Sequence, residues 1–109
     1  MSERTGPLSH IRVLDLTEFL AGPYGTQILG DLGAEIIKIE SIHGDSSRSV
    51  PPHFVAGSST YFTCINRNKK SIVVDLKSPD GIKVVRDLAL KCDVLFENGR
   101  PGVLARMGL

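Results

Sequence analysis

The chain has 109 residues, of which 41% are hydrophobic and 23% charged, so it can bury one modest core and is ordinary in composition for a globular domain. Its 13 basic and 12 acidic residues nearly balance, and no basic run is long enough to neutralise several neighbouring phosphates, so we expect no nucleic-acid partner. The apolar stretches fall far below the roughly 20 residues that span a bilayer, and residues 1–10 form a short polar tail without a targeting signal. We therefore predict a cytoplasmic protein with no membrane partner.

The first elements are a strand, a glycine-bearing turn, a helix and a second strand. The aliphatic run from Ile11 to Asp15 predicts a strand. Ala21 to Gly25 is typical of a turn, and Thr26 to Leu32 then has helical spacing that Gly33 ends. Ala34 to Glu40 is dense in isoleucine, which favours a second strand. Together these segments predict a βαβ unit.

A long segment without regular periodicity follows. Ser41 to Thr60 contains prolines, glycines and serines and predicts a loop, of a length that is uncommon unless the loop is functional or disordered. Within it, His43 to Asp45 predicts a turn, and we expect Asp45 to pair locally with Arg48 or to line the entrance to a site. Tyr61 to Ile65 predicts a helical turn, with Tyr61 and Phe62 in the core, and Asn66 to Lys70 predicts a polar corner.

The last third repeats the alternation of strand and helix. Ser71 to Asp75 predicts the third strand, and Ser78, Pro79 and Asp80 then supply a capping hydroxyl, a proline at the first helical position and an acid in the first turn. The helix is expected to run to about Lys91, and Asp93 to Glu97 predicts a fourth strand. Strands separated by helices predict an α/β fold with a Rossmann-like parallel sheet.

Ligands of such sheets bind beyond the carboxyl ends of the strands. Helix N-termini that follow glycine turns suit phosphate, so a nucleotide-like ligand is expected there. A nicotinamide cofactor would explain Glu40 at the end of the second strand, but the glycines do not form G-x-G-x-x-G, and Pro23 removes one N–H from the turn. The glycines are equally compatible with simple turns and close helix packing.

Other chemistry-bearing residues favour no site of their own. The two cysteines, Cys64 and Cys92, fit neither a disulfide framework nor a zinc site, and we expect both to be reduced core residues. No histidine near Cys64 offers a base for a nucleophile. His43, Asp45 and His53 have no further well-spaced ligand, so no metal is predicted.

Motifs along almost the whole chain after Pro7 resemble class III CoA-transferases of the CaiB/BaiF type, which include formyl-CoA transferase and succinyl-CoA:dicarboxylate CoA-transferases. The similar segments, in chain order, are Leu14–Thr17, Ala21–Pro23, Thr26, Leu29–Ala34, Ile37–Glu40, Gly44–Asp45, Arg48, Tyr61–Phe62, Asn66–Ile72, Asp75–Lys77, Gly81, Cys92–Val94, Glu97–Asn98, Pro101–Gly102 and Met107–Leu109. Their order and spacing together are specific. Residues 11–109 are thereby identified as the N-terminal part of the large CoA-binding domain of such an enzyme.

The resemblance implies an enzyme that moves CoA from an acyl-CoA to a small carboxylic acid and forms an interlocked homodimer. It also implies a nucleophilic aspartate that attacks the thioester to give a mixed anhydride. That aspartate belongs to a segment after the match to Met107–Leu109, so no aspartate of this chain is assigned as catalytic, and the 109 residues alone are expected to lack turnover. Two alternatives remain: an α-methylacyl-CoA racemase of the same fold, which the corner at Asn66 to Lys70 disfavours, and a non-catalytic CoA-binding protein.

The resemblance also implies a set of CoA contacts. These are Leu20, Ala21, Ser41, Val74, Asp75, Leu76, Lys77, Asn98, Gly99, Arg100 and Arg106. Lys77 and Arg106 are expected to pair with phosphates, and the backbone near Val74 and Asp75 to contact the adenine edge. Ser41 stands where formyl-CoA transferase has a basic residue, and Glu18 where it has a histidine near its active site, which implies a different acid substrate.

Overall fold

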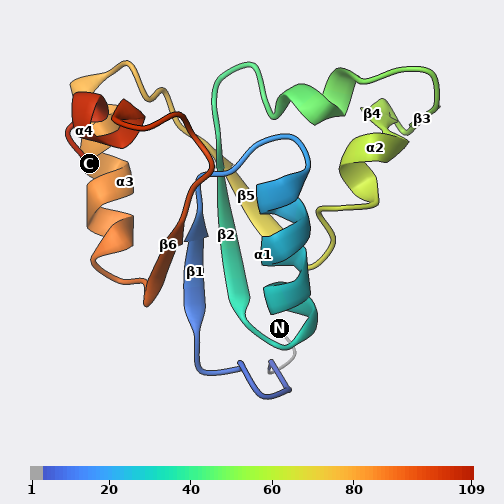
Figure 1. The fold of residues 1–109 in the computed structure, drawn as a ribbon, viewed down its shortest axis with the longest axis horizontal. Coiled ribbons are helices and arrows are strands. Elements are labelled where there is room, and N and C mark those ends of the chain that lie inside the picture. The colour runs from blue at the N-terminus through green and yellow to red at the C-terminus, as the bar shows by residue number, and fades with distance from the viewer. Residues whose placement is uncertain (1–3) are drawn as a thin grey trace.

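Figure 1 shows the computed structural model of the chain, which describes residues 4–109. Its centre is a four-stranded sheet in the order β5-β2-β1-β6. The strands are β1 (Arg12–Asp15), β2 (Glu35–Glu40), β5 (Lys69–Val73) and β6 (Val94–Phe96), and every neighbouring pair is parallel. The predicted α/β fold with a parallel sheet is therefore confirmed.

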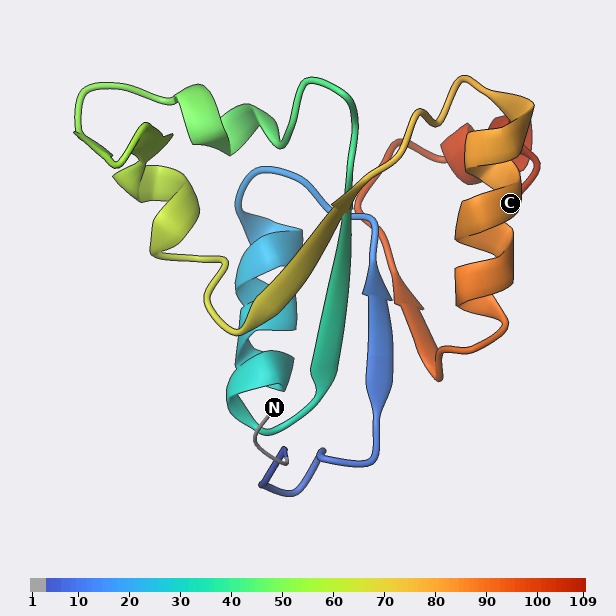
Figure 2. The same cartoon turned by 180° about the vertical axis from the view of Figure 1, so that it is seen from behind.

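Two long helices cover opposite faces of the sheet. Because successive strand residues point to opposite faces, Val13 and Ile36 face α1 (Ala21–Asp31), while Leu14 and Ile39 face α3 (Pro79–Ala89). On the α3 side, Val85 is fully buried against Leu14 and Ile39. The short α4 (Val103–Met107) lies beside α3 (Figure 2). The core is thus split into two apolar clusters separated by the sheet.

The first helix begins five residues earlier than predicted, because the expected turn at Ala21 to Gly25 is its first turn. Pro23 fits there, since the first N–H groups of a helix have no partner within it. Gly22 is needed at this position because a Cβ atom would lie 2.4 Å from the Cβ of Thr17. Glycine and proline here permit close packing of the helix start on the preceding loop, rather than a separate turn.

The third predicted strand is shifted. It covers Lys69–Val73, so part of the expected polar corner is a strand whose lysines are held by ion pairs. Pro79 and Asp80 begin α3 as predicted, but the Ser78 side chain makes no capping hydrogen bond although Ser78 occupies the cap position. Pro79 and Asp80 therefore predicted the start of the helix correctly. The Ser78 hydroxyl, which was expected to cap it, forms no hydrogen bond to the helix.

The segment predicted as one loop contains short elements. These are the 3-10 helix η1 (Ser46–Ser49) and the antiparallel strands β3 (Phe54–Val55) and β4 (Ser58–Ser59), followed by α2 (Thr60–Thr63). Each is too short to show periodicity. Together they form an arm that extends past α1 (Figures 1 and 2).

Two expectations about the core were wrong in this arm. Cys64 is exposed, and Tyr61 and Phe62 are only half buried. The reason is that α2 packs on η1 and β4 at the periphery rather than on the sheet, so its outer side meets solvent. Cys92, at the other end of the chain, is partly buried against the α3-side cluster, closer to the expectation. Within residues 4–109 no helix has both the length and the apolar character needed to cross a membrane.

Two helical glycines give a matched test of this packing. A Cβ atom on Gly81 would lie 1.9 Å from the carbonyl oxygen of Asp75, whereas one on Gly25 would meet only the ring of Phe96 at 3.4 Å. Alanine favours a helix over glycine by about 1 kcal/mol, but forcing α3 off its loop is expected to cost about 1–3 kcal/mol or more. Thermal or denaturant unfolding of the full-length protein should therefore show that G81A is destabilised and G25A is not. Equal changes in stability in the two variants would contradict the close packing of Gly81 on the Asp75 carbonyl.

Candidate functional site

A cleft of about 520 Å³ opens at the carboxyl ends of the strands, where the sequence predicts a ligand site. Its apolar lining comes from Leu16, Ile39, Leu76, Val103, Leu104 and Met107, together with Phe19. Its polar lining comes from Glu18, Ser41, Ser46, Glu97 and Asn98, and Gly99 completes it. The cleft therefore joins the ends of β1, β2 and β6 to the loop after β5 and to α4.

Four of the predicted CoA contacts line this cleft, namely Ser41, Leu76, Asn98 and Gly99. They come from three separate segments, which the parallel sheet brings to one edge. Their meeting in one cleft agrees with the position expected for a ligand. That these four residues contact CoA stays a prediction.

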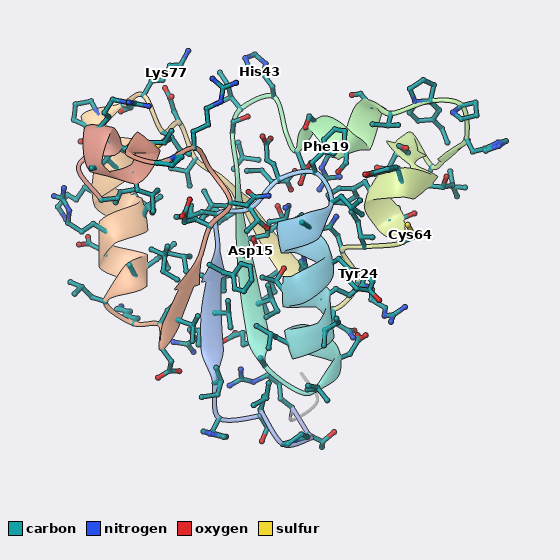
Figure 3. The ribbon with its side chains drawn as sticks, viewed as in Figure 1. Asp15, Phe19, Tyr24, His43, Cys64 and Lys77 are labelled. Atoms are coloured by element: carbon teal, nitrogen blue, oxygen red, sulfur yellow. The ribbon has the colours of Figure 1, made fainter. Side chains whose placement is uncertain are left out.

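Three further predicted residues flank the cleft at its edge. Leu20 caps α1 and Ala21 is its first residue, and both are exposed next to the cleft residue Phe19. Lys77 is exposed, and Figure 3 shows its side chain pointing away from the upper edge of the molecule, as does that of His43.

The remaining predicted residues are not in the cleft lining. Val74 is buried in the α3-side cluster, with its N–H donating to the Glu40 carbonyl at 2.9 Å. Asp75 is exposed and accepts a hydrogen bond from the Lys77 N–H at 3.0 Å. Arg100 and Arg106 are exposed, before and within α4. Among the ion pairs of the described residues, none involves Lys77, Arg100 or Arg106.

Under the loops of the cleft lies a layer of buried charge, on the α1 face of the sheet. Alternate strand residues form it: Asp15 ends β1, Lys38 and Glu40 end β2, and Lys69 begins β5. The side chains of Asp15 and Lys38 are 0% and 1% exposed, and that of Lys69 is 2% exposed. Charges this deeply buried are rare unless they are paired, and each of these has a partner.

Asp15 ties β1, β5 and α1 together at one point. Its Oδ2 accepts a hydrogen bond from Thr26 Oγ1 at 2.6 Å and lies 3.1 Å from Lys69 Nζ. Lys69 Nζ also donates to the Pro23 carbonyl at 3.0 Å and to Asn66 Oδ1 at 2.8 Å. Burial nevertheless lowers the pKa of Lys69, with the nearby Asp15 carboxylate opposing that effect.

Lys38 pairs with Asp45, which follows the turn after β2. The Lys38 Nζ lies 2.8 Å from Asp45 Oδ2 and donates to the Thr17 carbonyl at 2.8 Å. Asp45 Oδ1 accepts hydrogen bonds from the Ser47 N–H at 2.9 Å and from Ser47 Oγ at 2.7 Å. Burial opposes ionisation of Asp45, but its pairing with Lys38 and the hydrogen bonds from Ser47 outweigh it and lower its pKa.

Glu40 pairs with Arg48, at the start of the arm. Arg48 Nε and one terminal nitrogen donate to the two carboxylate oxygens at 2.7 and 2.8 Å, a bidentate arrangement. Ser71 Oγ and the Asp45 N–H also donate to Glu40. The Arg48 guanidinium lies 3.8 Å from the centre of the Phe62 ring, so the pair also holds α2. Burial raises the pKa of Glu40, but these hydrogen bonds outweigh it and bring the pKa to about 2.

Sequence reasoning missed this layer. It expected Asp45 and Arg48 to pair locally or to line an entrance, but Arg48 binds Glu40, Asp45 binds Lys38, and neither lines the cleft. The turn predicted at His43 to Asp45 lies slightly earlier, from Ser41 to Gly44, where the Gly44 N–H donates to the Ser41 carbonyl at 2.9 Å. One available signal was the placement of Lys38 and Glu40 two residues apart in an isoleucine-rich strand, which puts both charges on one face. In the described part of the chain, no cluster of three or more histidine, cysteine or acidic side chains is arranged to hold a metal.

The sequence pattern of CoA-transferase family III matches residues 8–109. The chain belongs to CoA-transferase family III. It is 56% identical over 104 residues to a succinyl-CoA:glutarate CoA-transferase of Mus musculus, which covers 94% of this chain and 24% of the relative. It is 46% identical over 105 residues to a formyl-CoA:oxalate CoA-transferase of Bradyrhizobium diazoefficiens, covering 95% and 25%.

A solved structure of a CaiB/BaiF family protein from Brucella suis has the same fold. It superposes with a TM-score of 0.91 at 41% identity, over 97% of this chain and 29% of that one. The predicted resemblance to the family III enzymes is therefore confirmed. The chain spans about a quarter of the length of the curated relatives that it matches.

The buried position of Glu40 in this family III chain predicts an acid-sensitive fold. Glu40 has a pKa of about 2 when folded, against 4.5 for the free group, so below about pH 4.5 the unfolded chain binds a proton that the folded chain does not. The stabilisation from Glu40 is complete above pH 4.5 and is lost as the pH falls towards 2. Unfolding of the full-length protein followed between pH 6 and pH 2 should therefore depend less on pH in E40Q than in the wild type.

Glu35 supplies the comparison. Its pKa is also held near 2, by hydrogen bonds from Lys70 and Arg12, but those partners are 56% and 41% exposed. Solvent screens such pairs, so E35Q should flatten the pH dependence less than E40Q. A larger effect from E35Q would show that the buried layer does not govern acid stability.

Proposed function

We propose that this protein is a CoA-transferase that moves CoA from an acyl-CoA thioester to a small carboxylic acid, and that residues 11–109 supply part of its CoA site. Family membership over residues 8–109 carries the proposal, since the matching relatives named above are CoA-transferases. The cleft at the carboxyl edge of the sheet supports it, because four residues expected to contact CoA line one space. We further propose that it works in the cytoplasm as an interlocked homodimer.

The proposed chemistry uses an aspartate located after Leu109 in the full-length protein. Its carboxylate oxygen attacks the thioester carbonyl, the C–S bond breaks, and CoA leaves as a thiolate with an acyl-aspartyl anhydride remaining. The thiolate then attacks the aspartyl carbonyl and releases the donor acid, and the acceptor acid takes CoA by the same two steps in reverse. No proton or electron is needed from a cofactor.

The residues of this chain would bind and orient the CoA. The apolar lining around Leu76 suits the pantetheine arm, and the exposed cations Lys77 and Arg106 suit the phosphates. The start of α1 at Leu20 and Ala21 would face the thioester end. Glu18 is a carboxylate at the cleft, and it is expected to influence which acid is accepted.

Isotope and trapping experiments on the full-length protein test the proposal. Incubation with succinyl-CoA and glutarate or oxalate should yield the new thioester, and hydroxylamine should trap an acyl-enzyme. Replacing the downstream aspartate by asparagine should abolish transfer. Exchange of the α-proton for solvent deuterium without transfer would point to a racemase instead, and CoA binding without either reaction would point to a non-catalytic protein.

Lys77 and Lys83 form a matched pair for the CoA site. Both are exposed lysines, but Lys77 follows β5 at the cleft edge, whereas Lys83 lies on α3 and pairs with Asp87 at 2.9 Å. Losing one charged contact to phosphate is worth roughly a fivefold to tenfold change in affinity. K77A should therefore raise the KM for acyl-CoA by about that factor and K83A should leave it unchanged. A similar KM for both variants would remove Lys77 from the site.

A further inference from the structure

The loop from Thr17 to Leu20, between β1 and α1, is held from several directions at the cleft. The Thr17 carbonyl accepts a hydrogen bond from Lys38 Nζ at 2.8 Å, and the Phe19 N–H donates to Asp45 Oδ1 at 3.3 Å. Lys38 and Asp45 are themselves joined at 2.8 Å. A closed ring of contacts thus runs from one end of the loop through the buried ion pair to the other end.

The residue between these two anchors is fixed by a third contact. The Glu18 N–H donates to Asn98 Oδ1 at 3.1 Å, and Asn98 Nδ2 donates to the Glu18 carbonyl at 2.8 Å. The amide of Asn98 therefore pairs with the Glu18 backbone as a neighbouring strand would. Three consecutive residues of the loop are anchored by side chains from β2, from the start of η1 and from the segment after β6.

The anchoring holds a conformation that the loop would not otherwise prefer. Phe19 has φ of 74°, in the left-handed region that a bulky residue rarely adopts. Such a residue costs about 1–3 kcal/mol and persists only where its surroundings impose it. In this conformation Phe19 and Leu20 are 47% and 49% exposed, and the centre of the Phe19 ring lies 5.4 Å from that of Tyr61.

We propose that Lys38 and Asp45 are positioning residues, which hold the Thr17–Leu20 loop in the conformation that CoA transfer requires. The inference rests on the proposed function, since it concerns the same cleft. Buried ion pairs are weak evidence for stability, because desolvation of the charges offsets their attraction. Lys38 and Asp45 also form hydrogen bonds to both ends of the Thr17–Leu20 loop. The conformation that they impose on this loop therefore explains the buried pair better than a gain in stability does.

The variant that tests this proposal is the double substitution K38M/D45N. It removes both charges, so neither is left buried and unpaired, and the asparagine introduced at position 45 keeps an oxygen for the Phe19 N–H. The anchor on the Thr17 carbonyl is lost. The matched control is E35Q, which breaks ion pairs at the opposite end of the same strand, far from the loop. Should the double variant not fold, K38Q/D45N is the second variant, because it also removes both charges and its shorter side chain at position 38 moves the donor away from the Thr17 carbonyl.

Two measurements on the full-length protein decide the matter. In K38M/D45N, amide hydrogen exchange of residues 18–20 should accelerate at least tenfold, and kcat should fall at least tenfold while the KM for acyl-CoA changes less than threefold. E35Q should change neither, whatever its effect on the melting temperature.

The outcomes separate the two proposals. Unchanged exchange in residues 18–20 of a folded variant overturns the positioning role, and so does a fall in kcat no larger than that of E35Q. If the wild-type protein transfers no CoA, the proposed function fails, but the exchange measurement still tests whether Lys38 and Asp45 order the loop. Faster exchange with normal kcat would show that the order of the loop does not matter for transfer, and would also overturn the proposal.

Discussion

The ion pair between Lys38 and Asp45 is the contact on which the carboxyl edge of the sheet depends. It lies under the loops of the cleft, with 1% and 0% of the two side chains exposed, so neither charge has water to stabilise it. Each must therefore keep its partner and its hydrogen bonds. Because those bonds go to Thr17, Phe19 and Ser47, the need to satisfy two buried charges fixes the paths of two loops at once.

The α1 face of the sheet changes character along the strands. Near the amino ends it presents Val13 and Ile36, which pack as an apolar cluster. Near the carboxyl ends it presents Asp15, Lys38 and Glu40. The apolar end supplies non-directional stability, whereas the charged end supplies contacts of defined direction. The α3 face stays apolar to the cleft, where Ile39 is shared by the core and the lining. Stability and precise positioning are thus assigned to different parts of one sheet.

The sequence predicted the fold better than the site. Runs such as Ile36 to Ile39 identify strands because their signal is local, and Pro79 marks a helix start for the same reason. The start of α1 was placed too late because Gly22 and Pro23 suit both a turn and a first helical turn, and only contact with Thr17 decides. The pair of Asp15 and Lys69 was missed because the two residues are distant in the chain. Lys38 and Glu40 have their partners in the segment just after β2, and there the path of the turn decides which acid meets which base. The register between two strands determines which of their charged residues meet. The hydrophobic periodicity of a single segment gives no information about that register.

The buried ion pairs also reduce the number of cationic side chains that are available to bind a ligand. Lys38, Lys69 and Arg48 are each committed to a carboxylate inside the protein, so an incoming phosphate would have to break an existing pair to use them. Among the described residues, Lys77 and Arg106 are exposed and join no ion pair. Lys77 follows the cleft residue Leu76, so it would attract an anion at the cleft edge, with solvent and salt weakening the attraction. The cations of this edge thus divide into buried side chains that hold the loops and exposed side chains that form no ion pair within the protein.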